Sequence, residues 1–286
     1  MSVVETMAVS GSCRDFRAGG NRYTVRIADT RELREKAYRL MYDIYVKIGY
    51  GHPHPSRMWY SLYGLLPDTV TVLVMDRDRA VATMTVVFDS PFGLPDDANY
   101  PEELNRQRAF GRNLAQIISL GVRADVCGGT KVLVKLFNFA YFVARGIRGA
   151  TDFVNTVIPR HAPFYYHKLL FEHVGEERYQ PKTGVNVVLI KLDFNEAEAE
   201  THREHGSLQR PGSTRHTLYK HFASVQEAPE VVESLASRIR PITREDLDFF
   251  LERRPEIWER AALDRKIRFD LVTGRLEKEG TGGYAA

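Results

Sequence analysis

The sequence contains few of the residues that mark secreted, metal-bound or membrane-spanning proteins. It has two cysteines, Cys13 and Cys127, in 286 residues, and neither lies at metal-ligand spacing from a second one. We therefore expect free thiols rather than a disulfide or zinc framework. No window approaches 18 uncharged apolar residues, and no basic patch followed by an apolar stretch opens the chain, so neither a membrane span nor a signal peptide is expected. A cytoplasmic location is the resulting prediction.

An excess of charge of one sign is also missing. The net charge is +3, and lysine and arginine alternate with acids rather than forming blocks, which argues against nucleic acid as a partner. The histidine pairs His52/His54 and His202/His205 lack a convincing third ligand, so no metal site is predicted. Neither a Gly-x-Ser-x-Gly motif nor a Cys/His arrangement indicates a hydrolase.

What is present is enough apolar sequence for a sizeable core. The hydrophobic content is 43%, and the length permits one large domain or one domain plus an appendage. Changes in composition divide the chain into three parts. We predict a flexible tail over residues 1–22, a domain over 23–194 and a helical extension over 195–286.

The first half of the domain has strand and helix patterns in alternation. A strand over 23–27 is followed by Thr30 as a helix N-cap and by apolar residues spaced by three and four from Leu33 to Ile48. The β-rich runs 70–75 and 80–88, separated by a short polar turn, predict an antiparallel hairpin.

The second half repeats the alternation. Strands are expected over 116–122 and 152–158, a helix after Gly128-Gly129, and a second helix at Pro159, because proline donates no ladder hydrogen bond. Val185–Leu192 is the last strand. This order predicts an α+β, or α/β three-layer, domain with a mixed sheet.

The C-terminal part has a different texture. Residues 195–230 are polar and loop-like, residues 231–268 read as helices, one of them begun by Thr243, and residues 280–286 form a tail. This extension carries no catalytic motif. It is expected to be a helical cover, a contact between two copies in a homodimer, or a surface for a partner.

Several separated motifs resemble one branch of the GNAT acyltransferase superfamily. They are Thr83–Pro95, Tyr100–Asn105, Arg108 with Gly111-Arg112, and Pro159–His161 with Phe164-Tyr165. In this order they look like the N-acyl amino acid synthases of the FeeM type, relatives of the acyl-homoserine-lactone synthases, over residues 23–194. The resemblance implies a GNAT fold and transfer of a long fatty acyl chain from acyl carrier protein to the α-amine of an amino acid.

The donor can be questioned from the residues themselves. Users of acetyl-coenzyme A in this superfamily hold pyrophosphate in an Arg/Gln-x-x-Gly-x-Gly/Ala loop, whereas the corresponding segment 123–129 has different spacing and contains an acid. This favours the 4′-phosphopantetheine thioester of acyl carrier protein over acyl-coenzyme A, and no tightly bound cofactor is expected. Arg123, Arg145 and Arg148 are candidate contacts for the acidic carrier, or ordinary solvated charges.

The resemblance also assigns catalytic roles. Backbone N–H groups near Leu120–Val122 would meet the thioester carbonyl, and Tyr165 would face the sulfur. Gln116 stands where the family has glutamate, and a neutral amide cannot take a proton, so water or His161 would accept it. Ser119 and Ile158 also depart from the family pattern. The helix starts at Gly129 and Pro159 suit an anion or oxyanion, or are plain turns.

The remaining candidate residues are assigned to the binding of the two substrates. Arg160 and His161 could instead pin the strand-to-helix junction, and aromatic residues at helical spacing are more often core than pocket. Residues assigned to the acceptor or acyl pocket are Arg39, Tyr42 and Tyr45. Residues assigned to acyl or pantetheine binding are Ser119, Leu120, Gly121, Val122, Arg123, Gly128, Gly129 and Arg160.

Two other functions stay open at this point. The replacements at 116, 119 and 158 would suit a degenerate GNAT fold that binds an acyl carrier or lipid without catalysis. The chain could also be a GNAT enzyme that uses acyl-coenzyme A and a different amine.

Overall fold

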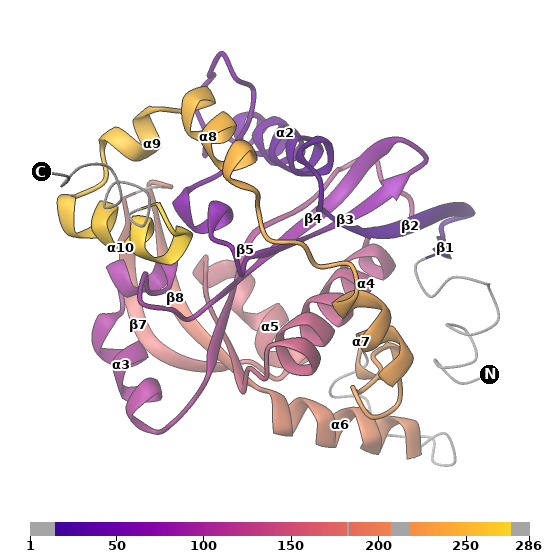
Figure 1. Ribbon diagram of the computed structural model, residues 1–286. Coiled ribbons are helices and arrows are strands. Elements are labelled where there is room, and N and C mark those ends of the chain that lie inside the picture. Colours follow the sequence, from indigo (N-terminus) through magenta and orange to yellow (C-terminus); the bar gives the residue numbers. More distant parts are fainter. Residues whose placement is uncertain (1–14, 182, 207–217, 276–286) are drawn as a thin grey trace, which may run out of the picture.

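A computed structural model describes residues 15–181, 183–206 and 218–275 and shows one mixed sheet between two layers of helices (Figure 1). The sheet has eight strands in the order β1-β2-β3-β4-β5-β6-β8-β7. The β5–β6 pair is parallel and the other neighbours are antiparallel. The predicted three-layer fold with a mixed sheet is thereby confirmed.

The elements have the following bounds. The strands are β1 (Asp15–Ala18), β2 (Asn21–Ile27), β3 (Val70–Asp76), β4 (Arg79–Phe88), β5 (Leu114–Val122), β6 (Asp152–Val157), β7 (Glu172–Gln180) and β8 (Val185–Asp193). The α-helices are α2 (Arg31–Lys47), α3 (Pro101–Ala109), α4 (Gly129–Tyr141), α5 (Ala162–Leu169), α6 (Phe194–Gly206), α7 (Pro229–Ala236), α8 (Arg244–Arg253), α9 (Glu256–Glu259) and α10 (Leu263–Thr273). Shorter helical turns are η1 (Leu62–Leu65), η2 (Pro95–Ala98), η3 (Phe142–Ile147), η4 (Pro159–His161) and η6 (Tyr219–His221).

Two hydrophobic cores cover the two faces of the sheet. Side chains alternate along a strand, so Val72 and Val74 of β3 belong to one core and Leu73 and Met75 to the other. The first core includes α4, α5, α6 and α7, and the second includes α2, α3, α8 and α10. A ligand that enters the sheet between two strands can therefore be reached by different helices from either side.

Many of the expected elements are found. Thr30 caps α2, where its hydroxyl accepts a hydrogen bond from the N–H of Leu33 at 3.3 Å. The β3–β4 hairpin forms, with Asp76 opposite Arg79 at its turn. β6 ends at Val157, before the proline, and Thr243 caps α8. Hydrophobic periodicity and cap residues thus predicted these elements correctly.

The sheet begins earlier than the sequence suggested. Residues 15–22, assigned to a tail, form β1, a turn and the start of β2. The turn residues Gly19 and Gly20 both have positive φ, +54° and +84°, which glycine adopts without steric cost. The expectation of a tail up to residue 22 is therefore wrong over residues 15–22, and residues 1–14 lie outside the described part of the chain.

Three polar elements were not predicted. β7 is an edge strand in which most side chains are exposed or charged, so it lacks the apolar alternation of a half-buried strand. α3 was taken for a polar segment, since it buries only Leu104 in its core. The start of the region predicted as loop, residues 195–206, belongs to α6. The predicted tail 280–286 lies outside the described residues.

Helices α8 and α10, in the last part of the chain, pack on the second face of the sheet. Phe250 of α8 lies edge-on against Tyr38 and Tyr60, and its carbonyl oxygen accepts a hydrogen bond of 2.6 Å from the Tyr60 hydroxyl. Phe269 of α10 contacts Phe92 in the loop after β4. These helices share one core with the sheet, and the division of the chain into domain and extension stays a prediction.

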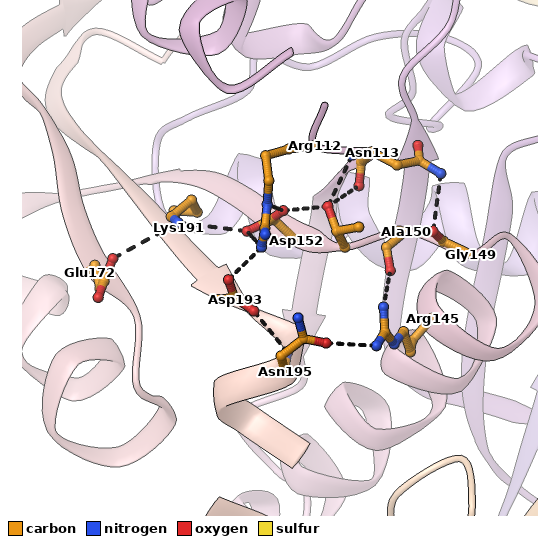
Figure 2. A network of polar contacts seen from close by, with 11 residues as sticks. Arg112, Asn113, Arg145, Gly149, Ala150, Asp152, Glu172, Lys191, Asp193 and Asn195 are labelled. Atoms are coloured by element: carbon orange, nitrogen blue, oxygen red, sulfur yellow. Dashed lines mark hydrogen bonds and ion pairs between the residues drawn. The ribbon is translucent and has the colours of Figure 1, made fainter. Parts of the chain in front are cut away.

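A buried ionic network joins the beginnings of β5 and β6 to the end of β8 (Figure 2). The Arg112 guanidinium bonds both carboxylate oxygens of Asp152, at 2.6 and 2.7 Å, and also bonds Asp193. The Asp152 side chain is fully buried, and the Lys191 ammonium is the next nearest cation, at 3.7 Å. Bidentate pairing of this kind fixes distance and orientation together.

Replacing Arg112 should therefore destabilise the fold strongly. We expect Arg112→Gln to lower the free energy of unfolding by about 3 kcal/mol or more, because it leaves the buried Asp152 carboxylate short of its main partner. Urea denaturation measures the change. The matched control is Arg244→Gln on the exposed Arg244–Asp248 pair, where we expect less than about 0.5 kcal/mol. Equal losses in the two variants would contradict this role of Arg112.

Candidate functional site

The two parallel strands of the sheet separate after a short stretch of pairing. β5 and β6 are in register at Leu114–Asp152, Ala115–Phe153 and Gln116–Val154, and then diverge. β6 continues to pair with β8 up to Val157. The divergence lies at the carboxyl ends of two parallel strands, where ligands commonly bind in sheets of this type. We call this divergence the splay.

A side chain of β6 bonds the backbone of β5 at the first position where the two strands no longer pair. The Asn155 amide donates to the carbonyl oxygen of Ile117 at 2.5 Å and accepts from the N–H of Ile117 at 3.5 Å. Asn155 is 8% exposed. Its amide replaces the backbone partner that Ile117 loses when the strands part, so the splay costs no orphaned hydrogen bond there. The sequence analysis missed Asn155, for which the available signal was a polar residue within an apolar strand.

A β-bulge lies directly beyond this point on β5. Thr83 of β4 pairs with Gly121, whereas Thr85 pairs with Ile118, so two residues of β5 face one residue of β4. Ser119 has φ of +51°, in the left-handed region. The bulge interrupts the regular ladder at Ser119 and Leu120, and it adjoins the N–H groups expected to meet a thioester carbonyl.

Helix α2 packs tightly over the bulge from the second face. A Cβ atom built on Gly121 would lie 2.7 Å from both the Met41 sulfur and the Ile44 side chain. A larger residue at 121 would push the flexible ends of Met41 and Ile44 aside, whereas glycine lets α2 pack closely there and leaves the backbone uncovered by a side chain.

Gln116 is buried on the second face, beside a carboxylate that the sequence analysis missed. Its side-chain oxygen accepts a hydrogen bond from the N–H of Asp96 at 3.1 Å. Asp96 is 2% exposed, and its Oδ1 accepts a bond of 3.0 Å from the Thr156 hydroxyl. Its other oxygen, Oδ2, is buried and has no hydrogen-bond partner among the described residues. Burial raises the pKa of Asp96 to about 6.

The loop that carries Asp96 is held by an arginine. Arg108 of α3 bonds Asp89 at 2.6 Å and Asp97 at 2.7 Å, and Asp97 also accepts from the N–H of Leu94 at 2.7 Å. Arg108 was already part of the motif resemblance. Its two carboxylate partners tie both ends of the loop to one guanidinium, which keeps η2 in place over the sheet.

A cavity of about 580 Å³ lies beside this loop, between it and α10. Gly93 and Asp97 of the loop line it, together with side chains of both charges. The charged lining residues are Asp89, Asp97, Arg108, Asp264, Arg265 and Arg268. The Arg265 guanidinium stacks over the rings of Tyr63 and Phe92 at 4.7 and 5.0 Å.

Tyr165 lies on the opposite, first face of the sheet. It is half-buried on α5, and its ring packs edge-on against Phe137 and Phe171. Burial raises the pKa of its hydroxyl, so it is a neutral phenol at pH 7. Arg160 and His161 precede it in η4, and both are exposed.

The N-terminus of α4 is packed against the turn between β1 and β2. Gly128 has φ of +70°, and a Cβ atom there would lie 2.8 Å from the Cβ atom of Ala18. Helix α4 begins at Gly129, as predicted. In the preceding segment Asp125 pairs with Arg123 at 3.1 Å and with Arg79 at 2.7 Å. Arg123 is therefore in an ion pair on the surface.

The other two arginines expected near that segment lie elsewhere. Arg145 is in η3, which follows α4, about 24 Å along the helix from Gly129. It pairs with Glu198 at 3.1 Å and bonds Asn195 at 2.8 Å (Figure 2). Arg148 pairs with Asp68 at 2.9 Å. The expectation that these two arginines flank the 123–129 segment is wrong, because the helix carries them away.

The three side chains expected to form an acceptor or acyl pocket do not converge. Arg39 is exposed and pairs with Glu35 on the same helix at 2.8 Å. Tyr42 is buried, and its hydroxyl accepts from the N–H of His54 at 3.1 Å. Tyr45 packs edge-on against Trp59. Only the two tyrosines face inward, which fits core packing at helical spacing.

The described residues contain neither a cluster of metal ligands nor a helix that could cross a membrane. No group of three or more His, Cys, Asp or Glu side chains in residues 15–181, 183–206 and 218–275 gathers as metal ligands. Across the same ranges, no helix is long and apolar enough to cross a membrane.

The solved structure of FeeM shows the kind of fold to which this arrangement belongs. FeeM, an N-acyl amino acid synthase from uncultured soil microbes, superposes with a TM-score of 0.54 at 20% identity, covering 62% of this chain and 94% of its own. The acyl-homoserine-lactone synthase LasI gives 0.48 at 13% identity, covering 62% and 92%. The coenzyme-A-dependent acyl-homoserine-lactone synthase MesI gives 0.43 at 18%, covering 66% and 97%.

Sequence comparison gives the family. No curated protein matches the chain significantly. The profile of the N-acyl amino acid synthase FeeM matches residues 36–193, which is more than half of the chain and includes the splay, the bulge, Asp96 and Tyr165. The protein therefore belongs to the FeeM family of N-acyl amino acid synthases and is an acyltransferase.

Proposed function

We propose that the protein transfers a long fatty acyl chain from acyl carrier protein to the α-amine of an amino acid. The observation that carries this proposal is the splay between β5 and β6, with the bulge at Ser119 on one edge and Tyr165 on the first face. An extended pantetheine arm can enter between strands that have parted. The family match supports the same reaction.

The chemistry needs a stabilised oxyanion, a neutral amine and a thiol leaving group. Backbone N–H groups next to the bulge, near Leu120–Val122, are the donors we assign to the oxyanion, and each preorganised donor typically contributes about 3 kcal/mol. The neutral phenol of Tyr165 would return a proton to the departing sulfur. A thiol has a pKa of about 8.5, so the thiolate is a fair leaving group even without this help.

Carrier protein is favoured as donor by the charges near α4. A coenzyme A thioester brings a pyrophosphate, whereas the carrier-bound arm has one phosphate. Asp125 places a carboxylate in the segment before α4 and pairs with Arg79 and Arg123, which leaves these two arginines less free to hold a pyrophosphate. Arg123, half-exposed beside it, is the contact we assign to the acidic carrier.

The acceptor is assigned to the second face of the sheet. A free amino acid has a positive and a negative group, and the cavity beside the Asp96 loop is lined by both arginine and aspartate. The Arg265 guanidinium is the group we assign to the acceptor carboxylate, because it is already oriented by two aromatic rings. On this assignment donor and acceptor meet at the splay from opposite faces.

The product is the direct test of the proposed function. We expect lipid extracts of cells that express the protein to contain N-acyl amino acids at levels at least about tenfold above cells with an empty vector, since this is within the range of a weak enzyme. Mass spectrometry detects them. Carrier binding without any such product would favour the alternative of a fold that binds an acyl carrier without catalysis.

The donor assignment predicts a preference between two thioesters of the same acyl chain. We expect kcat/KM for the carrier-bound chain to exceed that for the coenzyme A thioester by about tenfold or more, because a difference of about 1.4 kcal/mol in binding already gives this factor. Asp125→Asn should improve use of the coenzyme A thioester, because it frees Arg79 and Arg123 from their ion pairs with Asp125. If the coenzyme A thioester works at lower concentrations than the carrier, the assignment is wrong.

The role of Tyr165 is expected to be modest. Tyr165→Phe should lower kcat by about two- to tenfold, because the leaving thiolate is stable enough to depart alone. Thiol release followed with a thiol-reactive dye gives the rate. Tyr166→Phe is the matched control, since Tyr166 neighbours it on α5 and burial also raises its pKa. Equal rates for the two variants would contradict the assignment of Tyr165 as the proton donor to the leaving sulfur.

A further inference from the structure

We propose that Asp96 is the general base of the acyl transfer, and that its Oδ2 atom takes the proton from the attacking amine. This inference rests on the proposed function. Gln116 occupies the position to which the motif resemblance assigned proton removal, and its amide is neutral. Asp96 places a carboxylate directly against that amide.

Three elements converge to hold Asp96 at the splay. It comes from η2, while Gln116 comes from β5 and Thr156 from β6. The two strands pair up to Gln116 and have parted at Thr156, so Asp96 lies over the point where the splay begins. Gln116 fixes its backbone N–H and Thr156 fixes its Oδ1.

The remaining oxygen of Asp96 is the unusual feature. Oδ2 is buried and has no partner among the described residues. Buried polar atoms are nearly always paired, and an unpaired one carries the full penalty of lost hydration. A carboxylate oxygen kept in this state can accept a hydrogen bond from a ligand, and an amine that reaches the splay supplies the donor.

The charges around Asp96 leave it ionised at neutral pH. Burial, and to a smaller extent the carboxylate of Asp97, raise its pKa, whereas hydrogen bonds from the side chain and backbone of Thr156 and from Gln116 lower it; the resulting pKa is about 6. Asp97 is itself paired with Arg108. The other ionisable groups that interact with Asp96 are Tyr63 of η1 and Tyr100, which immediately precedes α3, and burial raises the pKa of each to about 12, so both are neutral.

The proposed step is balanced in atoms and charge. The amine nitrogen attacks the thioester carbon, a C–N bond forms, and the carbonyl oxygen becomes an oxyanion near the bulge. The proton on nitrogen passes to Asp96 Oδ2. The oxyanion collapses, the C–S bond breaks, and the sulfur leaves with the electron pair and is protonated by Tyr165 or water. Asp96 then releases its proton to solvent, and Tyr165, where it was the donor, regains a proton from solvent, so thioester and amine have become amide and thiol.

Gln116 is a positioning residue in this scheme. Its amide holds η2 and favours the ionised form of Asp96. Glutamate at 116 would place two carboxylates side by side, and such pairs share one proton at neutral pH. A glutamate there can act only if Asp96 is made neutral.

Exchanging the two side chains tests the proposal. We expect Asp96→Asn to lower kcat/KM by about 10²- to 10⁴-fold. The double variant Asp96→Asn/Gln116→Glu should recover at least about tenfold of this loss, because it returns one carboxylate to the same place. Wild-type kcat/KM should fall with decreasing pH below about 6 as Asp96 is protonated, and Asp96→Asn should lack this dependence. An active wild type whose Asp96→Asn variant stays within threefold overturns the role of Asp96 alone, whereas a wild type inactive with every donor overturns the proposed function.

Stability separates a base from a structural residue. The pKa of Asp96 is raised on folding, so its ionisation opposes folding, and the cost sets in as pH rises from its ordinary value of 3.8 to about 6. Asp96→Asn should therefore melt at the same or a higher temperature than wild type at pH 8. A structural carboxylate would give a lower melting temperature.

A second variant, at Thr156, keeps the proposal testable if Asp96→Asn does not fold. Thr156→Val removes a hydrogen bond that favours the ionised form. The pH at which kcat/KM falls should then move upward. An unchanged pH profile in Thr156→Val overturns the proposal.

Discussion

The pairing of Arg112 with Asp152 is the interaction on which the rest of the site depends. β5 and β6 can part only if they are firmly held where they meet, and the bidentate ion pair, joined by Asp193, fixes that end (Figure 2). Breaking a buried pair of this kind leaves a charge without a partner, which is far more costly than losing a surface pair. The two strands are therefore held together at the end where they begin and part beyond Gln116, where the Asn155 amide bridges to the backbone of Ile117.

The proposed scheme places the two proton-transfer groups on opposite faces of the sheet. Tyr165 of α5 packs on the first face, where we assign the sulfur, and Asp96 of η2 lies on the second face, where we assign the amine. In this scheme both groups act on one carbonyl held where β5 and β6 part. Arg108 of α3 holds the η2 loop through Asp89 and Asp97. Helix α3 buries only Leu104, so its main structural contribution here is the position of this guanidinium.

The sequence predicts this fold well where periodicity is strong and poorly where polar residues fill an element. The apolar face of α2 and the β-branched strands β3, β4 and β6 were recognisable, whereas β7 and α6 carry too many charges to show their period. The site residues likewise could be predicted only where a local sequence pattern marks them. Gln116 could be singled out from its motif, but Asp96 meets Gln116 and Thr156 across 20 and 60 residues, and no local pattern reports contacts of that range.

The position of Asp96 makes sense only when folding and chemistry are considered together. Raising a carboxyl pKa from 3.8 to about 6 corresponds to about 3 kcal/mol of lost stability at neutral pH, a large share of the net stability of a typical domain. Asparagine would keep the hydrogen bond from Thr156 and avoid that loss, so packing alone gives no reason for aspartate. A base that must accept a proton near neutral pH does give one, because its pKa has to lie close to the working pH, and burial beside the splay is what brings it there.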